Sequence, residues 1–74
     1  MTTTPLPGEL YCHRNGGLYV VVCIASEEAT ERPVVVYQSR QDGRHWTRPL
    51  EEFMDGRFWR ASGLTTTIVE ILDR

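Results

Sequence analysis

The sequence contains no lysine, so all eight of its basic residues are arginine, and ten acidic residues outnumber them. The formal net charge is therefore -2. A general nucleic-acid coat normally needs a basic excess, so we expect no such role, although a local basic patch remains compatible with this count. Arginine suits the recognition of carboxylate or phosphate groups, but a coding bias toward arginine would also explain the missing lysine.

Long hydrophobic runs are also missing. The longest one, Leu18–Ala25, falls far short of the roughly 18 apolar residues that a membrane helix needs, so we predict no membrane span. Met1–Pro5 shows neither the basic nor the apolar region of a secretory signal. We therefore expect a cytoplasmic protein.

Cysteine is scarce, with Cys12 and Cys23 as the two examples. Depending on which two residues of Asn15-Gly16-Gly17 form the turn, Cys12 lies opposite Tyr19 or opposite Val21. Neither register brings Cys12 within the ~7 Å between Cα atoms that a disulfide requires. We predict that both thiols are free and partly buried.

The chain has 74 residues, of which 41% are hydrophobic and 24% charged, so a single globular domain is expected. Leu18–Ala25 is rich in β-branched residues and lacks polar alternation, which predicts a central strand buried on both faces. Leu50–Met54, after Pro49, is predicted as one helical turn. The other predicted strands are Glu9–Arg14, Val34–Ser39, His45–Arg48 and Phe58–Ala61.

These elements predict an all-β protein, a small five-stranded antiparallel SH3-like barrel with one short helical turn and an extended C-terminal tail. The predicted organisation is a flexible leader at 1–8, the barrel at 9–62 and the tail at 63–74. The tail favours strand through Thr65–Val69, yet its apolar residues also fall at helical spacing, so strand and helix both remain open. Either the barrel or a partner chain must cover its apolar residues, which makes a homo-oligomer possible.

The second hairpin can be derived in more detail from Asp42-Gly43, the predicted centre of a tight turn. In that register Ser39 opposes Trp46 and Tyr37 opposes Arg48, and these four side chains share one face with Val35. Aromatic rings beside a guanidinium can stack a planar ring and bind a phosphate or carboxylate. Alternatively, Tyr37 and Trp46 belong to the core and Arg48 is a rim residue packed on Tyr37.

Catalytic and metal-binding patterns are weak. Two histidines and two cysteines lie too far apart for a metal motif, so we predict neither metal nor cofactor. Glu51 and Glu52 are neighbours on a helical turn and point in different directions, and the sequence has no nucleophile motif. His13, at a strand end, is more typical of a structural hydrogen bond, so an enzyme is not expected, although a small hydrolase with His13 as base is a further hypothesis.

Three segments together resemble the small bacterial proteins grouped as domain of unknown function 1653. They are Gly8-x-x-Tyr11-x-His13-x-x-Gly16-Gly17-x-Tyr19-x-Val21, Glu31-x-x-Val34-Val35-Val36-Tyr37 and Trp46-x-Arg48-Pro49-Leu50-x-x-Phe53. The resemblance implies a bacterial or phage cytoplasmic protein and supports a fold more than an activity. Its pattern singles out eight residues: Tyr11, His13, Gly16, Tyr19, Tyr37, Trp46, Arg48 and Pro49.

We expect a non-enzymatic binding module for a small anionic or aromatic ligand such as a nucleotide, or for a protein segment. An alternative is an oligomerising interaction or inhibitor protein, for example one encoded by a phage, that acts through the tail Ile68–Leu72. Tyr11 is expected to line the barrel more than the site. The predicted ligand-binding residues are Tyr11, His13, Tyr37, Arg44, Trp46 and Arg48.

Overall fold

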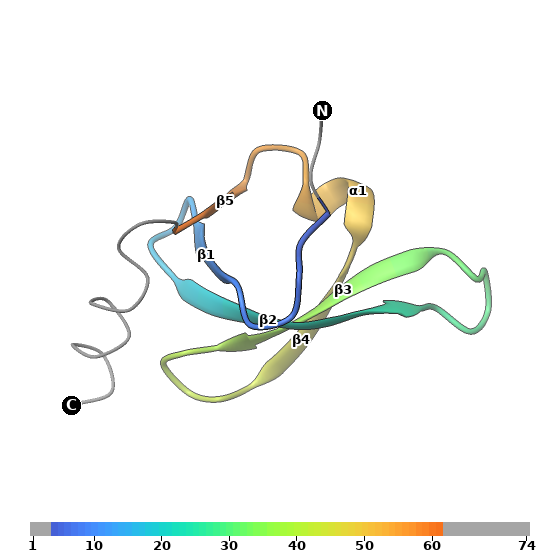
Figure 1. Ribbon diagram of the computed structural model, residues 1–74, viewed down its shortest axis with the longest axis horizontal. Helices are drawn as coiled ribbons and strands as arrows, with labels where there is room; N and C mark the ends of the chain where they lie inside the picture. The colour runs from blue at the N-terminus through green and yellow to red at the C-terminus, as the bar shows by residue number, and fades with distance from the viewer. Residues whose placement is uncertain (1–3, 62–74) are drawn as a thin grey trace.

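A computed structural model describes residues 4–61 and contains one antiparallel sheet in the order β4-β3-β2-β1-β5 (Figure 1). The predicted all-β class, with five antiparallel strands and one helical turn, is confirmed. Among residues 4–61, β4 and β5 are the outer strands of this order, so closure into an SH3-like barrel stays a prediction. The elements are β1 (Leu10–His13), β2 (Leu18–Ser26), β3 (Pro33–Ser39), β4 (His45–Pro49), α1 (Leu50–Phe53) and β5 (Phe58–Arg60).

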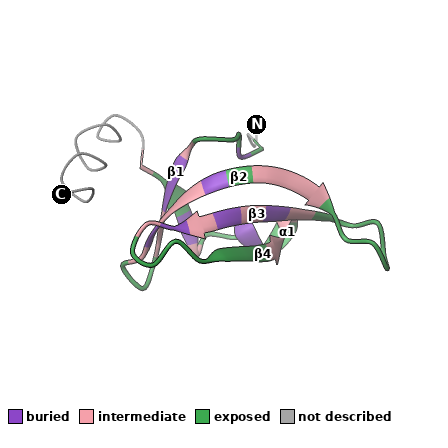
Figure 2. Ribbon diagram, turned by 90° about the horizontal axis from the view of Figure 1, so that it is seen from below, coloured by how far each residue is buried: buried purple, intermediate pink, exposed green. Residues whose placement is uncertain are grey.

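The core is built largely from aromatic side chains on one face of the sheet. Phe53 of α1 lies at its centre and is almost fully buried, and the Phe58 ring of β5 stacks on it with 4.2 Å between centroids. Burying aromatic rings is the main source of stability in so small a domain, because each removes a large apolar area from water. The buried cluster consists of Tyr11, Val21, Val35, Tyr37, Phe53 and Phe58, and Figure 2 shows the buried parts of β1, β2 and β3.

The first hairpin differs from both predicted registers. Cys12 pairs with Leu18 and Tyr11 with Tyr19, because the loop has three residues, Arg14 to Gly16, instead of two. Gly16 donates its N–H to the His13 carbonyl at 2.8 Å, and its φ of 98° is one that glycine adopts far more readily than other residues. A turn closed by such a glycine is a common three-residue hairpin loop.

The prediction that both cysteines are free is confirmed, although the hairpin register from which we derived it is wrong. Cys12 and Cys23 are both free and partly buried. Cys12 lies opposite Leu18, and Cys23 pairs with Val36 of β3, so the two thiols belong to different parts of the sheet.

The second hairpin is also wider than predicted. The Ser39 N–H donates to the Arg44 carbonyl at 2.9 Å, so the loop between them has four residues, 40–43, and not two. Tyr37 therefore lies opposite Trp46, and Val35 lies opposite Arg48. Because this register differs from the predicted one by an even number of residues, Tyr37, Trp46 and Arg48 still share one face.

β2 is the central strand, as predicted, but the expected burial on both faces holds only for its first half. The pairing with β3 shifts between Val21 and Cys23, and Val22 at this β-bulge is 39% exposed. α1 and the aromatic core cover one face of the sheet. On the other face Leu10 and Leu18 are also buried, whereas the residues of β2 that follow Val21 are half-buried or exposed. A continuous apolar run therefore does not imply that both faces are covered along the whole strand.

The predicted leader packs partly against the sheet. Pro5 is buried, and the Gly8 N–H donates to the Val21 carbonyl at 2.8 Å. The predicted tail 63–74, with its strand or helix alternative, lies outside the described residues. Within residues 4–61, no helix has the length and apolar character that crossing a membrane requires.

Candidate functional site

A pocket of about 210 Å³ opens on the face of the sheet that carries Tyr37 and Trp46. Four of the six predicted site residues line it. The pocket collects side chains from all five strands or their loops, which lie far apart in the sequence. Its lining consists of His13, Asn15, Tyr19, Tyr37, Trp46, Arg48 and Phe58.

Three rings form the floor of this pocket. The Tyr19 and Tyr37 rings meet edge to face at 5.3 Å between centroids, and Phe58 lies 5.4 Å from Tyr37 in a similar geometry. Edge-to-face pairs of this kind are favourable beyond the burial of their area. Because Tyr37 and Phe58 are also core residues, the floor is held in place by the packing of the whole domain.

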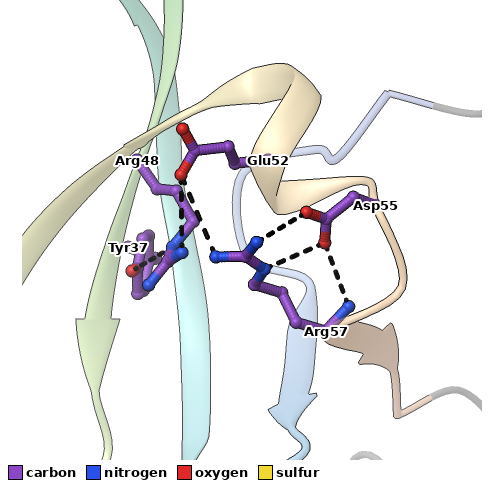
Figure 3. Close-up of polar contacts among 5 residues, drawn as sticks. All are labelled: Tyr37, Arg48, Glu52, Asp55 and Arg57. Atoms are coloured by element: carbon purple, nitrogen blue, oxygen red, sulfur yellow. Dashed lines mark hydrogen bonds and ion pairs between the residues drawn. The ribbon is translucent and has the colours of Figure 1, made fainter.

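Arg48 lies at the rim, with 27% of its side chain exposed (Figure 3). Its Nε donates to the Tyr37 hydroxyl at 3.4 Å, and its guanidinium carbon lies 5.6 Å from the centre of the Phe58 ring. The hydrogen bond that Arg48 donates to Tyr37 raises the pKa of Arg48 above its ordinary value, so the side chain stays charged at any working pH. The guanidinium therefore lies over the Phe58 ring of the aromatic floor.

Acidic side chains balance this charge on one side. The Glu52 Oε1 lies 3.7 Å from Arg48 Nη1 and 4.0 Å from Arg57 Nη1, and Asp55 forms an ion pair with Arg57 at 2.9 Å (Figure 3). These groups are partly exposed, so their ion pairs are weak. Within residues 4–61, Arg48 Nη2 makes no hydrogen bond or ion pair, which leaves it available to a ligand oxygen.

Trp46 forms an exposed wall of the pocket. It is 43% exposed, so the interpretation of Trp46 as a core residue is wrong, whereas Tyr37 is a core residue at 5%. The Arg44 guanidinium lies 5.2 Å from the Trp46 ring centre, outside the residues that line the pocket. Arg44 thus contacts the Trp46 ring through a cation–π interaction without lining the pocket itself.

His13 also lines the pocket. Its Nδ1 accepts the Asn15 N–H at 3.1 Å, and its ring meets Phe58 edge to face at 4.7 Å. Because Nδ1 acts as an acceptor, the neutral imidazole carries its proton on Nε2, which is a donor. The structural hydrogen bond expected of His13 is therefore present, and the same residue also lines the pocket.

Tyr11, like Arg44, is a predicted site residue that does not line this pocket. It is buried in the core, where its ring meets Phe53 edge to face at 5.0 Å. Burial raises the pKa of its hydroxyl. This placement agrees with the expectation that Tyr11 lines the fold more than the site.

Sequence reasoning missed three lining residues: Asn15, Tyr19 and Phe58. Tyr19 shares a face with Tyr11 and His13 in the observed register, whereas the predicted registers placed it on the other face. The family resemblance did single out Tyr19. Phe58 reaches the pocket because β5 pairs with β1, with Phe58 opposite His13, and no local pattern indicated that pairing.

A second hollow, of about 190 Å³, lies where β3 begins and α1 follows β4. Pro33, Pro49 and Leu50 make it apolar, and Arg32 forms an ion pair with Glu51 beside it. None of the predicted site residues lines it. Among the described residues, no group of three or more histidine, cysteine or acidic side chains could hold a metal ion.

The fold and the pocket define a small all-β protein with an aromatic pocket that carries an arginine at its rim. A family model described as "Protein of unknown function (DUF1653)" matches residues 9–57, which is more than half of the chain. The chain belongs to this family, as the resemblance predicted. No curated protein and no solved structure matches it.

Proposed function

We propose that the protein is a non-enzymatic binding module whose pocket takes one planar or apolar group next to an anionic group. The single observation that carries this proposal is that one pocket is lined both by the exposed Trp46 ring and by Arg48, whose Nη2 makes no hydrogen bond or ion pair within residues 4–61. The ring of a ligand would stack on Trp46 or on the aromatic floor. Its carboxylate or phosphate would accept hydrogen bonds from Arg48, which matches such groups well.

The size of the pocket supports a single ring or side chain and not a complete nucleotide. A cavity of about 150 Å³ holds one benzene molecule, and pockets for drug-sized ligands reach roughly 300 Å³ or more. At about 210 Å³ the pocket accommodates one ring and its acidic substituent. A nucleotide would place its base or its phosphate inside and leave the remainder outside.

The fluorescence of Trp46 provides a direct test. Trp59 lies on the strand next to Phe58 and is 53% exposed, so Trp59→Phe leaves Trp46 as the single indole. We expect phenylacetate and AMP to change the Trp46 emission saturably, and acetate and benzyl alcohol to bind about tenfold more weakly. A tenfold loss of affinity corresponds to about 1.4 kcal/mol of binding free energy, and we expect the ring and the acidic group each to contribute at least that much.

A pair of arginine variants distinguishes ligand binding in the pocket from a general effect of positive charge. Arg48→Gln should weaken the binding of phenylacetate at least about tenfold, because a charge-assisted hydrogen bond contributes roughly 1.5–3 kcal/mol. Arg60→Gln removes the same charge from β5, where Arg60 pairs with Glu9 at 2.7 Å, and should leave binding unchanged. Equal affinities in the two variants, or no saturable change with any of the four compounds, would contradict the proposal.

A further inference from the structure

The outer edge of β4 presents main-chain groups beside the pocket. Ser39 and Arg44 are a hydrogen-bonded pair, and such pairs alternate along an antiparallel ladder, so Trp46 and Arg48 direct their main-chain groups toward β3. His45 and Thr47 therefore direct their N–H and C=O groups away from β3. In the part of the chain that the structure describes, no strand pairs with this edge.

Side chains on this edge alternate between two faces. Trp46 and Arg48 face the pocket, and Arg44, whose guanidinium covers the Trp46 ring, lies on the same side. Along a strand, residues two apart are separated by roughly 7 Å. The edge thus carries an aromatic residue with one arginine about 7 Å before it along the backbone and another about 7 Å after it.

We infer that β4 binds an extended acidic peptide segment of another protein, which adds to the sheet as an antiparallel strand next to β4. This inference rests on the proposed function and specifies that the ligand of the binding module is a peptide. The residue opposite Trp46 sends its side chain to the face that carries the pocket, and acidic residues two positions away on either side lie opposite Arg44 and Arg48. Main-chain hydrogen bonds to His45 and Thr47 supply affinity, and the side chains supply specificity.

The charges on this edge favour an acidic segment over a second copy of β4. In an antiparallel pair of two β4 strands centred on Trp46, Arg44 of each copy would lie opposite Arg48 of the other. Like charges directly opposite each other destabilise a strand pair. Pro49 has no N–H to donate, so it limits the pairing segment to the residues before it.

A peptide built to this register tests the inference. The probe is acetyl-TEVFVET-amide, in which phenylalanine lies opposite Trp46 and the two glutamates lie opposite the two arginines. Binding is followed by calorimetry and by Trp46 fluorescence in the Trp59→Phe chain. We expect saturable binding that weakens as salt is added, because exposed charges are screened within about 10 Å at 0.1 M.

Methylation of single peptide nitrogens provides the matched control. The two valines lie opposite His45 and Thr47 and donate to β4, whereas the phenylalanine N–H points away from it. N-methylation of both valines should reduce affinity at least about tenfold, and N-methylation of the phenylalanine should leave it within about twofold. Equal losses in the two peptides would overturn strand addition.

A variant of the protein gives an independent measurement. Thr47→Pro removes an N–H that points to solvent, which a proline on an edge strand tolerates, so the ladder with β3 is kept. Its circular dichroism should match that of the parent chain, and it should lose at least about tenfold in affinity for the peptide. An unchanged affinity in the folded variant would overturn the inference, and a misfolded variant leaves the decision to the N-methylated peptides.

The outcomes separate this inference from the proposed function. If phenylacetate binds through Arg48 and the peptide does not bind, strand addition is wrong and the pocket proposal stands. If neither binds, both are wrong. If light scattering shows a dimer that Thr47→Pro abolishes, a second copy occupies the edge and the acidic segment is wrong.

Discussion

The two hairpins of this protein, β1–β2 and β3–β4, both form with loops wider than a two-residue turn, yet the consequences differ. In the first, the observed register pairs Cys12 with Leu18, one or three residues away from the predicted partners. In the second, the observed register pairs Tyr37 with Trp46, two residues away from the predicted partner. An odd shift moves every partner to the other face, and an even shift does not.

This difference explains which site residues were found from the sequence. In the second hairpin, Tyr37, Trp46 and Arg48 stayed on one face, so the predicted group meets at the pocket. In the first hairpin, Tyr19 moved to the face of His13, where the prediction had not placed it. The parity of the register, more than the size of the turn, decides which side chains meet.

The largest effect is expected at Phe58, where both hairpins contact the core. Phe58→Ala should lower the free energy of unfolding by about 3–5 kcal/mol, the usual cost of truncating a buried phenylalanine, because Phe53 and Tyr37 lose a stacked or edge-on partner. Urea unfolding followed by circular dichroism measures it. Trp59→Ala, on the exposed side of the same strand, should cost less than about 1 kcal/mol, and comparable losses would refute this account of the core.

Substitution of one glycine in each hairpin loop compares the two loops directly. Gly16 has φ of 98° and Gly43 has φ of 74°, and neither site places a backbone or core atom in the way of an added Cβ. Replacement by alanine therefore reports the cost of the backbone conformation, roughly 1–2 kcal/mol. We expect Gly16→Ala to cost more than Gly43→Ala in urea unfolding, because 98° lies further from the left-handed helical region; the reverse order would contradict this.

A shorter second loop tests the argument from parity. Deletion of Arg40 and Gln41 leaves Asp42-Gly43 as a two-residue turn, with Ser39 still opposite Arg44. We expect phenylacetate to bind the deletion variant as it binds the parent chain, since the pocket face is unchanged. Stability should fall by about 1 kcal/mol, because the hydrogen bond from the Arg40 N–H to the Leu18 carbonyl is lost. Loss of ligand binding in a folded variant would show that the loop, and not the register, forms the site.

The sequence was enough to predict the all-β class, the five strands and most of the second hairpin's binding face, because composition and turn residues are local signals. Register was not predictable, because side chains select the loop geometry: Asn15 Oδ1 accepts the Gly17 N–H, and Asp42 Oδ1 accepts the Arg44 N–H. The contribution of Phe58 depends on the pairing of β1 with β5, which only the assembled sheet determines.

The smallest effect is expected from two acidic residues, one next to each hairpin. The Leu6 N–H, followed by Arg60, lowers the pKa of Glu9, and the Arg44 N–H lowers the pKa of Asp42. A carboxyl whose pKa is lower in the folded state stabilises the fold above its unfolded-state pKa, and this stabilisation disappears as the pH falls through the folded-state pKa. The urea concentration at the midpoint of unfolding should therefore decrease as the pH is lowered from about 6 to about 3.

Replacing each carboxylate by the corresponding amide shows how much of this pH dependence comes from each hairpin. Glu9 also forms an ion pair with Arg60 at 2.7 Å and has only 19% of its side chain exposed, whereas Asp42 lies in an exposed loop. Glu9→Gln should therefore flatten the acid side of the stability profile more than Asp42→Asn does. A larger flattening with Asp42→Asn would place the acid sensitivity in the second loop and would contradict this ranking.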